Sequence, residues 1–255
     1  MDELIAVDIG NTNITLGLFK DKEIGDRFRI STNRNATTDE CFFWLKDMFP
    51  LWEQTSGIRS IVCSVVPSLT EPVSGAIERI TGKKPLIVSS DLNLGIEILY
   101  NPPEDVGADR IANAVAVSEF YQLPAVVIDL GTATTFDIVS GNREYIGGLI
   151  SPGIETSLSN LFQRAARLFP TDLIPVKSVI GKNTSDAIRA GTLYTAVDGI
   201  EGVTDRIESE IGKLSSVIIT GGLAEIVSGV LRRDVIVDIN ITLKGLYKIA
   251  ERNPQ

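Results

Sequence analysis

Two segments of the chain carry aspartate, glycine and short polar side chains in the same order, each between apolar stretches. The first is Asp8-Ile-Gly-Asn-Thr, and the second, about half a chain later, is Asp129-Leu-Gly-Thr. Glycine lets backbone N–H groups approach an oxyanion, while Thr and Asn add donors and Asp can hold a cation beside it. One such turn could be a simple hairpin, but two at corresponding places predict paired phosphate-binding turns and an enzyme that handles phosphate.

The chain contains no histidine, which removes Ser-His-Asp and Cys-His catalysis. Proton transfer must then fall to a carboxylate, Lys, Tyr or water. Asp109, which follows Gly107 near the expected start of a helix, is the candidate base, although Asp is also common there as a helix cap. The helix N-terminus is expected to lower the pKa of Asp109 and keep it ionised. Such a carboxylate still suits phosphoryl transfer, in which the proton is accepted late.

The remaining polar motifs each have a structural alternative. Asp129 could hold a hard cation such as Mg²⁺ or K⁺, or bond only its own turn. Gly147-Gly148 and Thr220-Gly221-Gly222 could let backbone approach a nucleoside, or could be tight turns. The segment Gly181-Lys-Asn-Thr184 could simply cap the helix that follows.

The composition of the chain limits the classes of binding partner and the compartment in which the protein is expected. A net charge of −9 and a pI near 4.7 disfavour binding to nucleic acid or to anionic membranes. No apolar run reaches the roughly 18–20 residues that span a bilayer, and the N-terminus lacks a basic region, so a cytoplasmic protein is expected. Cys41 and Cys63 have no metal or redox spacing, which fits a reducing compartment.

Hydrophobic patterning predicts the same order of elements in each half. In the first half we expect strands at 4–7, 14–19, 27–30, 58–66 and 85–88, with helices at 38–49 and 71–81. In the second half we expect strands at 125–128, 136–139, 144–146, 217–220 and 235–237, with helices at 155–166, 185–211 and 223–231. A further helix is expected to begin near Asp109.

These patterns predict an α/β protein in which each half is a five-stranded mixed sheet flanked by helices. The expected domains are residues 1–110 and 111–255, with the active site in the interdomain cleft. This architecture resembles the ribonuclease-H-like unit that is duplicated in the actin-like ATPase superfamily of actin, heat-shock ATPases and sugar kinases.

Several motifs occur in one order along the whole chain. They are Asp8-Ile-Gly-Asn-Thr, Tyr100-Asn-Pro, Gly107-Ala-Asp-Arg110, Asp129-Leu-Gly-Thr-Ala-Thr-Thr135, Gly147-Gly-Leu-Ile-Ser-Pro-Gly153, Gly181-Lys-Asn-Thr184 and Thr220-Gly-Gly222. Together they closely resemble the type III pantothenate kinases. Leu168-Phe-Pro-Thr-Asp172 departs from the family, whose members more often run from a basic residue straight into Leu-Pro.

The resemblance implies ATP-dependent phosphorylation of pantothenate to 4′-phosphopantothenate, the first step of coenzyme A biosynthesis. By matched position, the ATP-binding residues would be Asp8, Ile9, Gly10, Asn11, Thr12, Asn13, Ile14, Thr15 and Thr132. The pantothenate-binding residues would be Tyr100, Gly107, Ala108, Asp109, Arg110 and Thr184. Asp109 would accept the proton and Asp129 would bind K⁺ or NH₄⁺, with Mg²⁺ accompanying the nucleotide. The family also implies a homodimer with pantothenate near the subunit interface.

Two alternatives to the kinase stay open at this point. A catalytically silent, nucleotide-binding regulatory relative would be expected to have lost Asp109 or one of the turns, and neither is lost here. A phosphohydrolase of the same superfold would use a carboxylate to activate water, which the Tyr100 to Arg110 segment disfavours.

Overall fold

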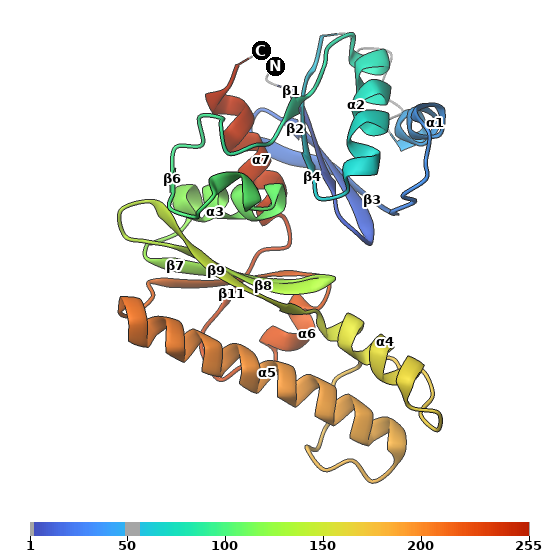
Figure 1. Ribbon diagram of the computed structural model, residues 1–255, viewed down its shortest axis with the longest axis vertical. Coiled ribbons are helices and arrows are strands. Elements are labelled where there is room, and N and C mark those ends of the chain that lie inside the picture. The colour runs from blue at the N-terminus through green and yellow to red at the C-terminus, as the bar shows by residue number, and fades with distance from the viewer. Residues whose placement is uncertain (1–2, 49–56, 255) are drawn as a thin grey trace. The chain divides into compact units, whose positions relative to one another are not determined.

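The computed structural model describes residues 3–48 and 57–254 of the chain (Figure 1). Its first half contains β1 (Glu3–Ile9), β2 (Asn13–Lys20), β3 (Glu23–Ser31), α1 (Thr38–Met48), β4 (Arg59–Ser64), α2 (Pro67–Thr81), β5 (Leu86–Ile87), β6 (Glu97–Ile98), the 3₁₀ turn η2 (Pro103–Asp105) and α3 (Ala108–Phe120). The second half contains β7 (Ala125–Leu130), β8 (Ala133–Val139), β9 (Glu144–Pro152), α4 (Ile154–Arg164), α5 (Thr184–Ile211), β10 (Ser216–Gly221), α6 (Ala224–Ser228), β11 (Ile236–Val237) and α7 (Ile241–Arg252).

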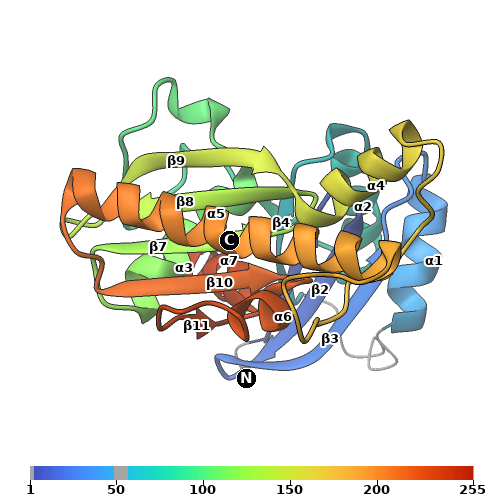
Figure 2. The ribbon, with the colours of Figure 1, turned by 90° about the horizontal axis from the view of Figure 1, so that it is seen from below.

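The strands form two mixed sheets with the same connectivity. The first has the order β3-β2-β1-β4-β5, and the second has the order β11-β10-β7-β8-β9-β6. In both, an antiparallel hairpin leads into parallel neighbours, as the pairing of β1 with β2 and β4 and that of β7 with β8 and β10 demonstrate. Figure 2 shows β9, β8, β7 and β10 in this order, with α5 across them. The predicted duplicated α/β fold is therefore confirmed.

The second sheet has six strands where five were expected. The additional strand is β6, which pairs in parallel with the start of β9 through Glu97 and Glu144. Strand β9 also continues through Gly147 and Gly148 to Pro152, whereas the sequence suggested that it would stop before these glycines. Glycine weakens a strand without forbidding it, and here the neighbouring strand β8 carries the pairing onward.

Packing divides the chain into two compact units. Unit 1 contains Met1–Phe120, Arg143–Ile146 and Asn240–Gln255, and unit 2 contains Tyr121–Asn142 and Gly147–Ile239. This grouping differs from the expected division after residue 110, because α3 packs against α7, a helix that the hydrophobic pattern did not predict. The two helices approach closely at Gly245, where an added Cβ would lie 2.6 Å from the carbonyl carbon of Ala112.

The element boundaries follow local chemistry. Helix α2 begins at Pro67, four residues before the expected start, because proline suits the first helical position. Helix α6 is shorter than expected and ends at Ser228. Helix α1 was expected to reach Phe49, which lies outside the described residues. Within residues 3–48 and 57–254, none of the helices combines the length and the apolar character that a membrane crossing requires.

The first sheet has one apolar and one polar face at its loop end. Side chains alternate along each strand, and those of Ile9, Ile14 and Leu16 belong to the core that α1 and α2 complete. Asp8 and Thr15, which are paired neighbours on β1 and β2, must then project from the opposite face. The alternation therefore directs the polar side chains of the first turn away from the core.

Candidate active site

The first Asp-x-Gly turn connects β1 to β2 and is fastened to the end of β3. The N–H of Gly10 donates to the carbonyl of Asn13 at 3.0 Å, which closes the turn. Thr32 binds the turn through two hydrogen bonds. Its N–H donates to the carbonyl of Thr12 at 2.9 Å, and its hydroxyl donates to the carbonyl of Gly10 at 2.7 Å. The turn is thus a braced loop whose Asn11 and Thr12 are exposed.

Arg34 is a residue of this loop that sequence reasoning did not identify. Its guanidinium donates to the side-chain oxygen of Asn11 at 2.9 Å, and its own carbonyl accepts a hydrogen bond from the Ser68 hydroxyl at 3.0 Å. The separation of 23 residues between Arg34 and Asn11 hid this contact in the sequence.

Residues 8 to 15 do not offer equivalent groups to a ligand. The side chains of Ile9 and Ile14 are fully or almost fully buried, with 0% and 3% exposure, and belong to the core under α1 and α2. They can therefore contribute only backbone groups. The polar side chains in this range are those of Asp8, Asn11, Thr12, Asn13 and Thr15.

Asp109 lies in the first turn of α3, directly after Gly107 and Ala108. Its Oδ1 accepts a hydrogen bond from the N–H of Arg110 at 2.8 Å. Burial nevertheless raises the pKa of the Asp109 carboxyl, and the backbone bond and charge of Arg110 oppose that effect without overcoming it. The expectation that the helix N-terminus would lower this pKa was wrong, because removal of water outweighs the helix end here. A raised pKa makes Asp109 a stronger base.

Cys63 lies across from Asp8 on the sheet and belongs to β4, the strand against which the Asp109 helix α3 packs. Cys63 is fully buried on β4, directly across from Asp8 in the parallel pairing of β1 and β4. Burial raises the pKa of the Cys63 thiol well above its usual value, and the charges of Asp8 and Asp109 and a hydrogen bond to Asp8 raise it further. The thiol therefore stays protonated, and its pKa responds to two carboxylates that are 101 positions apart in the sequence.

Tyr100 and Arg110 meet at Tyr145, a second residue that sequence reasoning did not identify. The Tyr100 and Tyr145 rings have centroids 6.3 Å apart, and the Arg110 guanidinium carbon lies 5.8 Å from the Tyr145 centroid. Tyr145 is 1% exposed and belongs to the part of β9 that packs with unit 1. Its residue type carries no signal of a binding role, because tyrosine is common in strands.

The second Asp-x-Gly turn, in unit 2, is also closed by the N–H of its glycine, but its loop is one residue shorter than the first. The N–H of Gly131 donates to the carbonyl of Ala133 at 3.0 Å. The carbonyl of Thr132 accepts bonds from the N–H of Gly153 at 3.0 Å and from the hydroxyl of Thr156 at 2.7 Å. The start of α4 therefore fixes the backbone of Thr132 and leaves its side chain exposed.

Two distant glycines pack against this turn. An added Cβ at Gly153 would lie 2.5 Å from the carbonyl oxygen of Thr132, and one at Gly221 would lie 2.5 Å from that of Leu130. Gly221 also has a φ of +94°, which favours glycine. Both motifs therefore bring backbone against the strand end that carries Asp129, whose neighbours across the sheet are Thr135 and Thr220.

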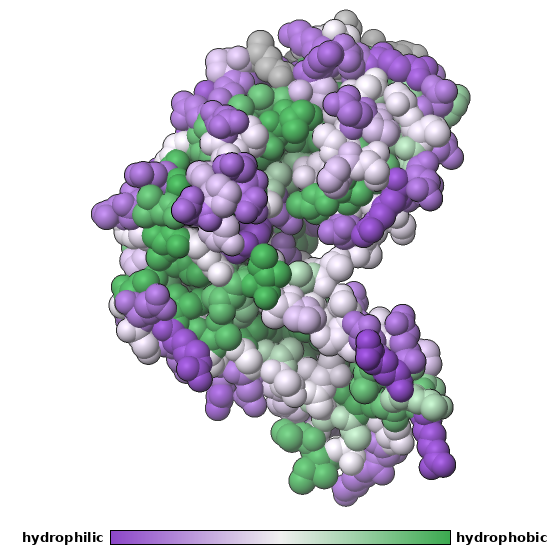
Figure 3. All heavy atoms as spheres, viewed as in Figure 1, coloured by the Kyte–Doolittle hydropathy of each residue, from purple (hydrophilic) through white to green (hydrophobic). Residues whose placement is uncertain are grey.

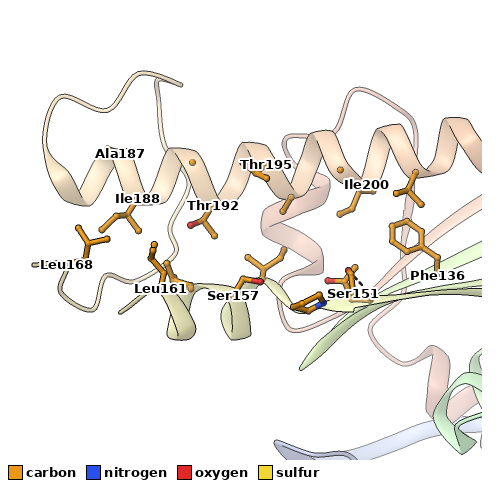
Figure 4. A pocket seen from close by; sticks show the side chains of 18 of the residues that line it. Phe136, Ser151, Ser157, Leu161, Leu168, Ala187, Ile188, Thr192, Thr195 and Ile200 are labelled. Carbon is orange, nitrogen blue, oxygen red and sulfur yellow. Dashed lines mark hydrogen bonds between the residues drawn. The ribbon is translucent and has the colours of Figure 1, made fainter. Parts of the chain in front are cut away.

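Thr184 lies at the start of α5, where Asn183 is the helix cap. The Asn183 side chain accepts a hydrogen bond from the N–H of Asp186 at 2.9 Å. Thr184 also lines a cavity of about 900 Å³ in unit 2, between α5, α4 and the ends of β8 and β9. The lining is mostly apolar, and Figure 4 shows the side chains of Phe136, Leu161 and Ile188 pointing into this space.

The candidate residues are thus divided between the two units. Unit 1 carries the Asp8 to Thr15 turn, Tyr100, and Gly107 to Arg110, whereas unit 2 carries Asp129, Thr132 and Thr184. Within the described part of the chain, His, Cys, Asp and Glu side chains form no group of three that could hold a metal ion.

Solved structures support the fold. A Baf family protein from Campylobacter jejuni superimposes with a TM-score of 0.58 at 22% identity, over 98% of each chain. A ROK family glucokinase from Streptomyces griseus superimposes with a TM-score of 0.50 at 16% identity, also over 98% of each chain. At these identities the likeness establishes the architecture and nothing about the substrate.

Sequence relatives identify the family. The family model of the type III pantothenate kinases matches residues 4–206. The type III pantothenate kinase of Brevibacillus brevis is 43% identical over 258 residues, which cover 98% of this chain and 99% of the relative. The match therefore includes both Asp-x-Gly turns and the segment around Asp109, and the chain belongs to the type III pantothenate kinase family.

Proposed function

We propose that the protein transfers the γ-phosphoryl group of ATP to the primary hydroxyl of pantothenate, which yields 4′-phosphopantothenate for coenzyme A biosynthesis. Family membership supports this reaction. The observation that carries the assignment of the chemistry is geometric: Cys63 on β4 lies directly across from Asp8, and α3, which carries Asp109, packs against β4. The proposed base and the proposed phosphate-binding turn thus both belong to unit 1.

The Asp8 to Thr15 turn is proposed to bind the ATP phosphates. Its backbone N–H groups and the Thr12 and Thr15 hydroxyls can donate to phosphate oxygens. Mg²⁺ is commonly bound through one or two carboxylates together with substrate phosphates, and Asp8 fits this role. The metal would neutralise charge on the phosphates. Thr132, which is exposed in the second turn, is proposed to contact the nucleotide.

Asp109 is proposed to accept the proton of the pantothenate hydroxyl. Its raised pKa brings the carboxylate closer to the strength that a general base needs at neutral pH. Tyr100 and Arg110, which share the Tyr145 ring, are proposed to bind pantothenate together with Gly107 and Ala108. A guanidinium there suits the pantothenate carboxylate.

Asp129 is proposed to bind K⁺ or NH₄⁺. Its place at the end of β7, close to backbone carbonyls at which Gly221 and Gly153 pack, supports this role because hard cations prefer carboxylate and carbonyl oxygens. The ion would offset negative charge near the nucleotide.

We also propose a homodimer in which Thr184 contributes to the pantothenate site. The apolar groove along α5 and the exposed Leu161, Phe169, Val179 and Ile180 support a contact with a second copy. Figure 3 shows apolar surface at the end of unit 2 that carries the connection from α4 to α5. Sedimentation equilibrium would test this part, and a monomer at micromolar concentration would contradict it.

The reaction is tested by measuring ATP consumption by the purified protein with and without pantothenate, in K⁺ and in Na⁺ buffer. We expect consumption to require pantothenate and to be faster in K⁺. Asp109→Asn should reduce kcat by about 10²- to 10⁴-fold, and Asp129→Asn should remove the difference between K⁺ and Na⁺. Consumption that ignores pantothenate would refute the substrate, and a fully active Asp109→Asn variant would refute the base.

A further inference from the structure

Strand β3 carries two arginines whose side chains lie on the same face of the sheet as Asp8 and Thr15 of the proposed phosphate-binding turn. Arg27 and Arg29 are two positions apart, so both project from one face. Phe28 between them packs against the core on the other face. The face of Arg29 is therefore the polar face.

Strand register aligns Arg29 with the turn. Arg29 pairs with Thr15 on β2, and Thr15 pairs with Asp8 on β1. Neighbouring strands lie about 5 Å apart, and directly paired side chains are on the same face. Arg29, Thr15, Asp8 and Cys63 thus form one row across four strands, and Arg29 ends that row beside the turn.

The charges of Arg27 and Arg29 interact, and in the described part of the chain neither arginine is paired with a carboxylate. In residues 3–48 and 57–254, neither guanidinium has an ion pair or a side-chain hydrogen bond, whereas several other arginines are paired with carboxylates, namely Arg79, Arg143, Arg189, Arg232, Arg233 and Arg252. Loss of water around Arg27 and then the charge of Arg29 lower the pKa of Arg27. A single exposed arginine needs no partner, but two adjacent ones repel each other, and an anion would relieve that repulsion.

We propose that Arg29 binds the terminal phosphates of the nucleotide that occupies the Asp8 to Thr15 turn. The inference rests on the proposed function for the identity of the nucleotide. It adds a cation to a turn whose other polar groups are neutral donors and the negative Asp8. The planar guanidinium matches the geometry of phosphate oxygens and binds them with two parallel hydrogen bonds. Arg34, which follows the end of β3 and donates to Asn11 at 2.9 Å, adds a second cation beside the turn.

The test is titration calorimetry of the full chain with Mg²⁺-ATP and, separately, with AMP, in the absence of pantothenate. We expect Arg29→Gln to weaken ATP binding by about 10- to 100-fold, the usual effect of losing hydrogen bonds to a charged group. AMP lacks the terminal phosphates, so its affinity should change by no more than about twofold. Arg29→Lys keeps the charge and loses the planar fork, so it should give an intermediate loss of ATP affinity.

Lys20→Gln is the matched control. Lys20 lies at the opposite end of the same hairpin, where its neighbours across the strands are Glu3 and Glu23. Its replacement by Gln removes the same charge from unit 1 as Arg29→Gln does. We expect its affinities for ATP and AMP to stay within about twofold of the wild-type values. This control separates a local contact from the general effect of net charge.

Two outcomes would overturn the inference: an unchanged ATP affinity in Arg29→Gln, or an equal loss of affinity for ATP and AMP. If Arg29→Gln does not fold, the ratio of ATP to AMP affinity in Arg29→Lys decides. A wild-type protein that binds ATP but does not phosphorylate pantothenate would contradict the proposed function and leave the role of Arg29 to be judged from these ratios.

Discussion

The carboxylate of Asp109 occupies the space that a side chain at Gly107 would need. An ideal Cβ on Gly107 would lie 2.6 Å from Oδ1 of Asp109, well inside van der Waals contact. Gly107 has no positive φ, so its backbone conformation does not require glycine. The restriction comes from the Asp109 carboxylate, which occupies the place of a Cβ. The position of the proposed base is therefore set by the absence of a side chain two residues earlier.

Gly107→Ala should displace Asp109 without unfolding the protein. Because a misplacement of about 1 Å at a reacting group can cost about 10²-fold in rate, we expect kcat to fall by about 10- to 100-fold. The melting temperature should stay close to the wild-type value, since Gly107 is only partly buried. Steady-state kinetics and calorimetry measure the two quantities. Gly141→Ala, where an added Cβ meets open space, is the control, and equal kcat values for the two variants would contradict the displacement.

Asp109→Asn should stabilise the protein while it impairs catalysis. The folded-state pKa of Asp109 is raised, so folding favours the protonated carboxyl. That stability is fully present below the ordinary Asp pKa of about 3.9 and is lost as the pH rises through the folded-state pKa. At neutral pH the ionised Asp109 therefore destabilises the fold, and the neutral amide removes this cost. Thermal unfolding at pH 7 should show a higher melting temperature for the variant, and the difference should shrink towards acidic pH.

The activity should depend on pH through the same carboxyl. In the proposed reaction the ionised form of Asp109 accepts the proton, so kcat/KM for pantothenate should rise with pH, with a midpoint above the ordinary Asp value of about 3.9. Cys63, whose thiol pKa is raised well above its usual value, should not titrate in the neutral range. A pH series of kcat/KM measures the midpoint. A midpoint at or below the ordinary value would contradict the dominance of burial over the charge of Arg110.

Gly153→Ala should destabilise unit 2, because its Cβ would meet the backbone of the second turn at Gly131 and Thr132. Backbone cannot move aside as a flexible side chain can, so we expect a loss of about 1–3 kcal/mol in the free energy of unfolding. Gly202→Ala, inside α5 with open space around the added Cβ, should instead gain about 0.5–1 kcal/mol. Urea unfolding measures both, and two changes of the same sign would refute the steric argument.

The sequence predicted best those elements whose formation depends on residues only a few positions apart. Alternating apolar residues and the Asp-x-Gly turns were sufficient to predict both hairpins and the repeated order of strands. Two elements were not predicted: α7, although its buried apolar residues repeat with helical spacing, and β6, a two-residue strand that exists only through its pairing with β9. A strand that short has no periodic pattern to detect.

The identity of the turns, the absence of histidine and the candidacy of Asp109 were determined by the sequence alone, because they depend only on residue type and spacing. Tertiary structure decided the electrostatics. The helix start was expected to lower the pKa of Asp109, yet burial raises it. Cys63 became part of the site only because parallel pairing of β1 and β4 sets it beside Asp8. Desolvation and charge interactions depend on what surrounds a group in space, and residues from distant parts of the chain create those surroundings.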